Sequence, residues 1–277
     1  MDMKAVLRAI NNAVPVEDGE SDYTENGLKM CGKCGTPKQV RVELGGKMAT
    51  VNCMCRCQLE KAERDEAERQ RLKEESRIAE LRRECFSDSK MERWTFDADD
   101  GKDARLMKVA NAYAVRFDEL RAEGKGLLLW GDTGNGKSFA AACIANALID
   151  RGVPCLMTNF ARLSNIVNAT FQDKQRRIDE LDGYELLVID DLASERDTEY
   201  MNEVVFAIID ARYRSGKPLI VTTNLTADEL KNPETMHRKR VYSRIMEMCV
   251  PVKVEGADRR RAKMGEDYKR ISSMLGL

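Results

Sequence analysis

Residues 127–138 read Leu-Leu-Leu-Trp-Gly-Asp-Thr-Gly-Asn-Gly-Lys-Ser, an apolar run that leads into a glycine-rich loop. Every fixed position of the pattern G-x-x-x-x-G-K-[ST] is present between Gly131 and Ser138. The apolar run predicts a buried strand, and the alanine-rich segment after the loop predicts a helix. A loop between a strand and a helix N-terminus cradles phosphate groups with its backbone N–H groups. The sequence therefore predicts a nucleotide-binding α/β domain.

The loop also predicts roles for its side chains. We expect Lys137 to reach the β- and γ-phosphates of ATP and Ser138 to ligate Mg²⁺. The predicted nucleotide-binding residues of this segment are Gly131, Asp132, Thr133, Gly134, Asn135, Gly136, Lys137, Ser138 and Phe139.

A second apolar run, residues 186–189, ends in two acids, Asp190 and Asp191. We expect Asp190 to hold the magnesium ion and Asp191 to orient the water that attacks the nucleotide. Asp191 stands where many such ATPases have a glutamate, which is one methylene longer. A nucleotide-dependent switch with little hydrolysis therefore stays open as an alternative to an ATPase.

Strand-like and helical patterns alternate from about residue 100 onward. This alternation predicts a parallel five-stranded sheet with helices on both faces. Ligands of such sheets bind at the carboxyl ends of the strands, so we place Thr223 and Asn224 near the γ-phosphate. The predicted strands are residues 127–130, 154–157, 186–189, 219–222 and 250–254.

Composition excludes several protein classes. Hydrophobic residues make up 43% and charged residues 34% of the 277-residue chain, which is typical of a soluble globular protein. No apolar run is long enough to cross a bilayer, and the N-terminus lacks the apolar segment of a signal peptide. We therefore expect a cytoplasmic protein. Residues 236–277 hold 11 Lys/Arg against 5 Asp/Glu, which suits either nucleic-acid contact or a solvated helix face.

Five of the nine cysteines lie between Cys31 and Cys57. A Cys31-x-x-Cys34 turn precedes residues 39–52, which read as a hairpin around a Gly-Gly pair, and a Cys-x-Cys-x-Cys segment follows. Four thiolates suit a structural Zn²⁺ ion, and iron–sulfur binding or free thiols are the alternatives. The predicted zinc ligands are Cys31, Cys34, Cys53 and Cys55, with Cys57 as the alternate.

Together these motifs resemble those of the DnaC/DnaI helicase loaders and the related IstB transposition ATPases, both of the AAA+ class. The resemblance rests on residues 126–138, 187–192 and 222–224 and on Arg240-Val-Tyr-Ser-Arg244, and it covers about residues 100–265. It implies that Arg244 is an arginine finger that acts on the nucleotide of a neighbouring subunit, supported by Arg240. It also implies that Thr223 and Asn224 form the first phosphate sensor and that Arg260, or Arg259, forms the second.

The same resemblance implies partners. Family members assemble into spirals or rings and bind single-stranded DNA, and Thr198 and Tyr200 fall in the segment that faces DNA in the loaders. The alternative reading of that segment is a helix cap at Asp197 or Thr198. The zinc ribbon is similar to the N-terminal domains of Gram-positive loaders and their phage counterparts, which engage the replicative helicase.

The sequence therefore predicts three parts: an N-terminal segment with a zinc ribbon (1–57), a charged helical linker (58–99) and an AAA+ P-loop ATPase domain (100–277). The predicted function is ATP-dependent loading of a replicative helicase onto DNA, with ATP, Mg²⁺ and structural Zn²⁺ as cofactors. The alternatives are an IstB-like transposition helper and the nucleotide-dependent switch.

Overall fold

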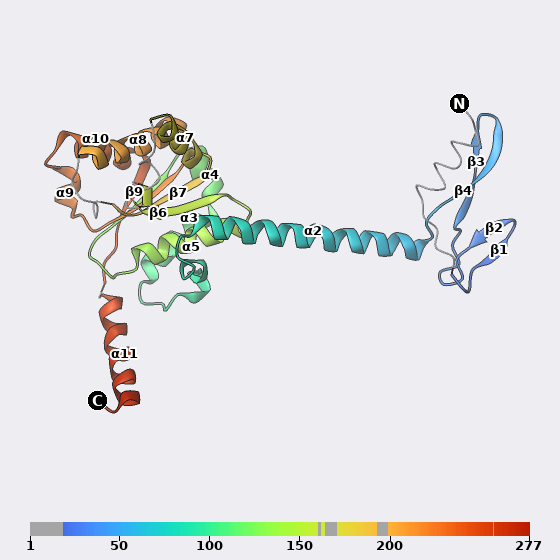
Figure 1. Ribbon diagram of the computed structural model, residues 1–277, viewed down its shortest axis with the longest axis horizontal. Helices are drawn as coiled ribbons and strands as arrows, with labels where there is room; N and C mark the ends of the chain where they lie inside the picture. Colours follow the sequence, from blue (N-terminus) through green and yellow to red (C-terminus); the bar gives the residue numbers. More distant parts are fainter. Residues whose placement is uncertain (1–18, 160–161, 164–170, 193–198, 257) are drawn as a thin grey trace. The chain divides into compact units, whose positions relative to one another are not determined.

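The computed structural model describes residues 19–159, 162–163, 171–192, 199–256 and 258–277. The chain divides into two compact units, Met1–Ser76 and Arg77–Leu277. One long helix, α2 (Arg56–Cys85), runs across this boundary (Figure 1). Ion pairs four residues apart, such as Arg71 with Glu75, join successive turns of its charged surface. A charged helix thus follows the cysteine cluster, as the sequence predicts.

Two β-hairpins form the first unit. β1 (Tyr23–Glu25) pairs antiparallel with β2 (Leu28–Met30), and β3 (Gln39–Leu44) pairs antiparallel with β4 (Lys47–Asn52). The turn between β3 and β4 is Gly45-Gly46, with φ angles of 59° and 75°. A two-residue hairpin turn of type I′ has both residues in this left-handed region, which glycine enters without strain. The hairpin predicted over residues 39–52 is confirmed.

A five-stranded parallel sheet forms the centre of the second unit (Figure 1). The strand order is β6-β7-β8-β5-β9, and each neighbouring pair is parallel. This arrangement confirms the predicted fold class. The bounds are β5 (Gly126–Trp130), β6 (Cys155–Asn159), β7 (Leu186–Leu192), β8 (Leu219–Thr223) and β9 (Cys249–Lys253).

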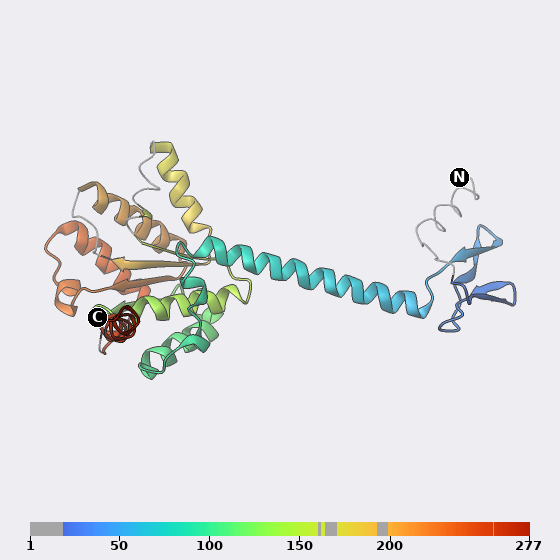
Figure 2. The ribbon, with the colours of Figure 1, turned by 60° about the horizontal axis from the view of Figure 1, so that its bottom comes forward.

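Helices cover both faces of the sheet (Figure 2). Alternate residues of a strand point to opposite faces, so Leu127 and Leu129 join one apolar core while Leu128 joins the other. The first core receives α3 (Ala104–Val115), α4 (Phe117–Ala122) and α5 (Lys137–Ile149). The second receives α7 (Phe171–Asp182), α8 (Glu199–Ser215), α9 (Ala227–Lys231) and α10 (Met236–Met248). The last helix is α11 (Arg259–Leu275).

The second unit begins earlier than the predicted boundary at residue 100. Cys85 and Phe86 are buried in its first core. Two short 3-10 helices follow, η1 (Met91–Arg93) and η2 (Phe96–Ala98). The side-chain amide of Asn146 in α5 donates to the carbonyl oxygens of Met91 and Trp94, each at 2.9 Å. These bonds attach the η1 segment to the helix that follows the phosphate loop.

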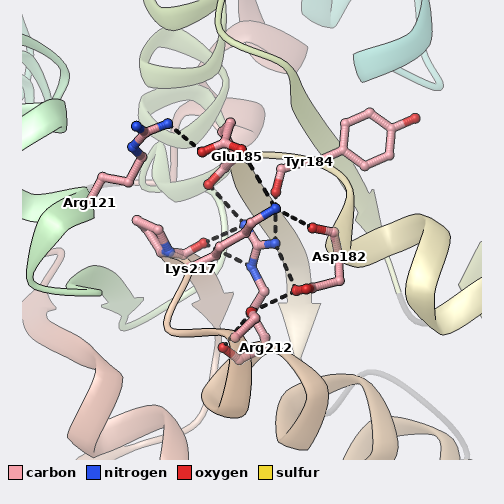
Figure 3. A network of polar contacts seen from close by, with 8 residues as sticks. Arg121, Asp182, Tyr184, Glu185, Arg212 and Lys217 are labelled. Carbon is pink, nitrogen blue, oxygen red and sulfur yellow. Dashed lines mark hydrogen bonds and ion pairs between the residues drawn. The ribbon is translucent and has the colours of Figure 1, made fainter.

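Arg212 of α8 joins the segments that enter β7 and β8 (Figure 3). Its side chain is 1% exposed and donates to the carbonyl oxygens of Tyr184 (2.8 Å), Glu185 (2.9 Å) and Pro218 (3.0 Å). Asp182 accepts from the same guanidinium at 3.3 Å. Buried carbonyl groups need such donors, so this network fixes the amino ends of the two strands. The carboxyl ends of the same strands carry the candidate site.

Within the described ranges, no helix combines the length and the apolar character that crossing a membrane requires.

Candidate nucleotide site

The glycine-rich loop lies between β5 and α5 and lines a pocket of 450 Å³. Gly134 has a φ of 78°, and a Cβ atom there would lie 2.0 Å from the Asp258 carboxylate. Only glycine therefore lets the backbone pass at this point. Seven of the nine predicted nucleotide-binding residues line the pocket: Thr133, Gly134, Asn135 and Gly136 of the loop, and Lys137, Ser138 and Phe139 at the start of α5.

Lys137 lies against its own loop. Its side-chain ammonium donates to the carbonyl oxygens of Gly131 (2.7 Å) and Asp132 (2.6 Å), and the residue is only 6% exposed. Gly131 and Asp132 thus contribute their carbonyl groups to Lys137 and do not line the pocket themselves. A bound phosphate would offer the ammonium a charged acceptor, and charge-assisted bonds of that kind are stronger than those to carbonyl groups.

The acidic end of β7 meets the polar end of β8 at this pocket. The Thr222 hydroxyl donates to the Asp190 carboxylate at 2.6 Å and accepts from the Asp191 N–H at 2.9 Å. Thr222 therefore fixes the orientation of the Asp190 carboxylate. Both acids and Thr222 line the same pocket as Lys137 and Ser138.

Asp191 adopts a left-handed backbone conformation with a φ of 62°. The strand register between β7 and β8 shifts at this point, between Ile189 and Leu192. The Asn224 side-chain amide donates to the Asp191 carboxylate at 2.8 Å, and Asn224 also lines the pocket. At this register shift, the Asp191 carboxylate and the Asn224 amide are thus held together in the lining of the pocket.

The structure corrects the prediction that placed Thr223 beside the nucleotide. Thr223 is fully buried, and its hydroxyl donates to the Leu192 carbonyl oxygen at 2.8 Å. Successive strand residues point to opposite faces, so Thr222 takes the position that was predicted for its neighbour. The apolar run from residue 219 did not reveal which of the two threonines faces the site.

One wall of the pocket comes from the end of the segment that the sequence assigned to the linker (58–99) and from Asp100, directly after it. Trp94, Ala98 and Asp100 line it, and the Trp94 ring lies 5.9 Å from the ring of Phe139. Aromatic and small apolar side chains suit a nucleobase, whereas the loop suits its phosphates. The only sequence sign of this wall is the aromatic pair Trp94 and Phe96 after a run of charged residues.

Arg259 is the arginine that lines this pocket from α11. Its guanidinium lies 3.0 Å from the Asp100 carboxylate, and its backbone N–H donates to the Gly134 carbonyl at 2.9 Å. Arg259 was the alternative to Arg260 for the second phosphate sensor, and the side chain of Arg260 lies outside the described part of the chain. Thr198 lies outside it as well, and for Tyr200 only the helical backbone is described.

Arg240 and Arg244 line a different hollow, of 480 Å³, together with Phe206, Lys239 and Ser243. Neither arginine lines the nucleotide pocket of its own chain.

The cysteine cluster is gathered by the turn before β3 and the start of α2. The sulfur atoms of Cys31, Cys34, Cys55 and Cys57 all lie within 4.8 Å of one another. Four sulfurs around a zinc ion are about 3.8 Å apart if each Zn–S bond is about 2.3 Å, so this set fits a tetrahedral ion. No other such cluster is found among the described residues.

Cys57 replaces Cys53 in this set, which corrects the predicted choice of ligands. The prediction assumed an extended segment, in which residues 53, 55 and 57 share one face. The structure instead begins α2 at Arg56, so Cys57 lies in the first helical turn beside Cys55. The Cys53 thiol contacts the Pro37 carbonyl at 3.5 Å.

Cys34 and Cys57 differ in pKa. The hydrogen bond with the Thr36 hydroxyl lowers the pKa of Cys34 to about 5. The hydrogen bond with Cys55 raises the pKa of Cys57 to about 12. A metal ion needs thiolates, so its binding at neutral pH would release the proton of Cys57.

Known proteins resemble most of this chain. The sequence model of the IstB-like ATP binding protein family matches residues 48–265. The replicative helicase loader DnaI of Bacillus subtilis is 26% identical over 150 residues, which are 50% of this chain and 48% of the relative. A Sinorhizobium fredii protein named as an insertion sequence ATP-binding protein is 32% identical over 166 residues, 59% of this chain and 53% of the relative. The chain thus spans about half the length of these curated relatives.

The crystal structure of DnaI shares the fold of the second unit. It superimposes with a TM-score of 0.53 at 23% sequence identity and covers 63% of this chain and 95% of that chain.

Proposed function

The chain belongs to the family of IstB-like ATP-binding proteins, and on this premise we propose that it is an ATPase that loads a replicative helicase onto DNA. One observation supports the catalytic part most directly. Lys137 and Ser138 of the loop, the Asp190–Thr222 pair and the Asp191–Asn224 pair all converge on a single pocket.

In this proposal each group has a separate task. Lys137 and the loop N–H groups bind the phosphates, and Ser138 and Asp190 hold Mg²⁺. The magnesium ion supplies charge that stabilises the phosphates during transfer. Asp191, held by Asn224, orients the attacking water, and Arg259 contacts the phosphates from α11. Trp94 and Phe139 bind the base.

We assign Arg244 to the nucleotide of a neighbouring copy, with Arg240 beside it. Both line a hollow on α10 that is separate from the pocket of their own chain. An arginine supplied to a γ-phosphate by another subunit accelerates hydrolysis by about 10³- to 10⁵-fold.

The helicase and DNA belong to the proposal through the relatives. The names of two kinds of relative, DnaI of Bacillus subtilis and DnaC of Escherichia coli, describe them as replicative helicase loaders. We propose that the first unit binds the helicase and that Zn²⁺, held by the four gathered thiols, provides its folding energy. Thr198 and Tyr200 remain the proposed contacts with single-stranded DNA.

A transposition helper is the second candidate. The family name and the insertion-sequence relative from Sinorhizobium fredii favour it. Affinity capture with the purified full chain separates the two: a helicase partner supports the loader, and a transposase partner supports the helper.

Steady-state ATP turnover tests the catalytic proposal. We expect single-stranded DNA to change the turnover rate and Lys137→Ala to abolish it. We also expect Arg244→Ala protein to lower the activity of wild-type protein when the two are mixed. Normal turnover by the Lys137→Ala protein would refute the assigned site. Activity that only averages in the mixture, without a response to DNA, would favour the nucleotide-dependent switch.

A further inference from the structure

Arg244 is held in a defined place by α8. Its guanidinium Nη2 lies 2.6 Å from Oδ1 of Asp210. The same guanidinium lies 4.5 Å from the centre of the Phe206 ring and 5.6 Å from the centre of the Tyr213 ring. The Tyr213 hydroxyl in turn donates to Glu247 of α10 at 2.9 Å. One carboxylate and two rings, all from α8, thus surround an arginine of α10.

The hollow in front of Arg244 is strongly basic. Lys239, Arg240 and Arg244 all line it, with the Ser243 hydroxyl between them. Three cations at one hollow repel one another and favour an anion with several negative oxygens. Asp210 contacts Arg244 but is not among the residues that line the hollow. Its carboxylate therefore holds the guanidinium without occupying the place of that anion.

The ion pair joins Nη2 of Arg244 to Oδ1 of Asp210. A guanidinium has three nitrogens and five N–H donors in a planar fork, so a second acceptor can be bound at the same time. A long arginine side chain otherwise samples many rotamers, and ordering it during each turnover would cost rate. The Asp210 contact and the stacked rings order it in advance.

We propose that Asp210 is a positioning residue for Arg244, which it holds ready for the nucleotide phosphate of a second copy of this chain. This inference rests on the proposed trans role of Arg244 and adds to it the group that sets its geometry. Two other roles of Asp210 would give different results. If Asp210 only linked α8 to α10, its replacement would change the assembly of the copies. If Asp210 instead neutralised and restrained Arg244, its replacement would raise the rate of the reaction.

Donor and acceptor copies separate these possibilities. The acceptor is the Arg244→Ala protein, whose nucleotide pocket is intact. The donor is the Lys137→Ala protein, whose pocket is inactive but whose Arg244 is intact. Donor is titrated into a fixed amount of acceptor, and phosphate release from ATP is followed. The midpoint of the titration reports association of the copies, and the plateau reports turnover at the acceptor's site.

We expect Asp210→Ala in the donor to lower the plateau by about 10- to 100-fold, because small misplacement of a catalytic group has effects of this size. The midpoint should stay within about twofold, since the residue does not line the hollow. Asp210→Asn should retain a larger part of the plateau, because its amide oxygen still accepts from the guanidinium. The matched control is Arg214→Ala, which removes the 70%-exposed partner of the other Asp210 oxygen. It should leave both values unchanged.

The outcomes are distinguishable. If the unmodified donor gives the acceptor no activity, the trans role of Arg244 fails, and the proposed function loses its intersubunit part. If that donor works but Asp210→Ala and Asp210→Asn reach the same or a higher plateau, Asp210 does not position Arg244. A shift of the midpoint alone also overturns the inference in favour of a structural link. Thermal melting of each donor checks that it is folded, and Asp210→Asn, which keeps the side-chain shape, decides the matter if Asp210→Ala is unstable.

Discussion

Asp191 combines a strained backbone with a candidate catalytic carboxylate. Its φ of 62° lies where most residues with a Cβ atom are disfavoured, although asparagine and aspartate tolerate it. We therefore predict that Asp191→Asn leaves stability almost unchanged but lowers ATP turnover at least about 10²-fold, an effect typical of lost proton transfer or water orientation. Chemical denaturation and phosphate release measure the two effects.

Asp191→Ala is the matched comparison. It should lower turnover as strongly and also lower the free energy of unfolding by about 1–2 kcal/mol, because alanine has no side chain to compensate the left-handed conformation. Equal stability of the two variants would contradict the strain argument. Full turnover in Asp191→Asn would remove Asp191 from the mechanism.

The cysteines give a second prediction at the scale of single residues. We expect the full chain to bind one Zn²⁺ ion, Cys57→Ser to lose most of its zinc, and Cys53→Ser to keep it. The reason is that the Cys57 sulfur lies with the three others, whereas Cys53 contacts a carbonyl group. Elemental analysis of purified protein after dialysis gives the metal content. Zinc loss in Cys53→Ser with retention in Cys57→Ser would restore the ligand set expected from the sequence.

The spacing of residues in the sequence predicts which chemical groups form these sites. It predicts less well which way each side chain points. The loop motif and the Asp-Asp pair are fixed by local pattern, and they lie in one pocket. Thr223 was predicted beside the nucleotide where Thr222 lines the pocket, and Cys53 was preferred to its alternate Cys57, because each choice depends on one local change of structure. For Thr222 this is the strand phase, and for Cys57 it is a helix that begins one residue before it.

Among the elements, α8 carries the arginine that joins the segments entering β7 and β8. Arg212 is almost fully buried and satisfies the carbonyl groups of Tyr184, Glu185 and Pro218. Arg212→Met should lower the free energy of unfolding by about 3–5 kcal/mol, because it leaves these three carbonyl groups without their donor. Urea denaturation measures this loss. Arg214→Ala, two residues along the same helix but 70% exposed, is the control and should change stability by less than about 0.5 kcal/mol.

A small effect of Arg212→Met would mean that other donors, such as Lys217, replace it in the network. Lys217 already donates to the Asp182 carbonyl at 2.6 Å.

The strands of the sheet were the most predictable elements of this structure. Each of the five expected strands is present, since buried parallel strands are continuous apolar runs that few other structures share. The network around Arg212 was not predictable, because a buried arginine looks in sequence like any charged residue at the end of a helix. The η1 and η2 segment was also missed, since its few apolar residues have no clear period.

For the molecule as a whole, the two compact units should unfold independently. Both tryptophans of the chain, Trp94 and Trp130, lie in the second unit, so tryptophan fluorescence reports that unit alone. We expect a zinc chelator to leave the fluorescence melting curve unchanged. Saturating ATP with Mg²⁺ should raise its midpoint, because a ligand at 100 times its dissociation constant stabilises the folded state by about 2.7 kcal/mol.

Far-ultraviolet circular dichroism follows both units and supplies the control. It should show a loss of structure on chelation that fluorescence does not show. A chelator that shifts the fluorescence midpoint would mean that the units stabilise each other. The position of their boundary, at Ser76 instead of residue 99, could not be predicted from composition, because α2 stays highly charged on both sides of it.

The strand order has a consequence for how the chain is made on the ribosome. β5 is the first strand of the sheet to be synthesised, yet its two neighbours, β8 and β9, are the last. Until residue 253 has left the exit tunnel, at least one edge of this apolar strand has no partner. Nascent or truncated chains therefore expose a long-lived aggregation-prone edge, whereas the cysteine unit is complete early. Chaperone demand should accordingly fall on the second unit, and premature stop codons as late as residue 248 should yield insoluble protein.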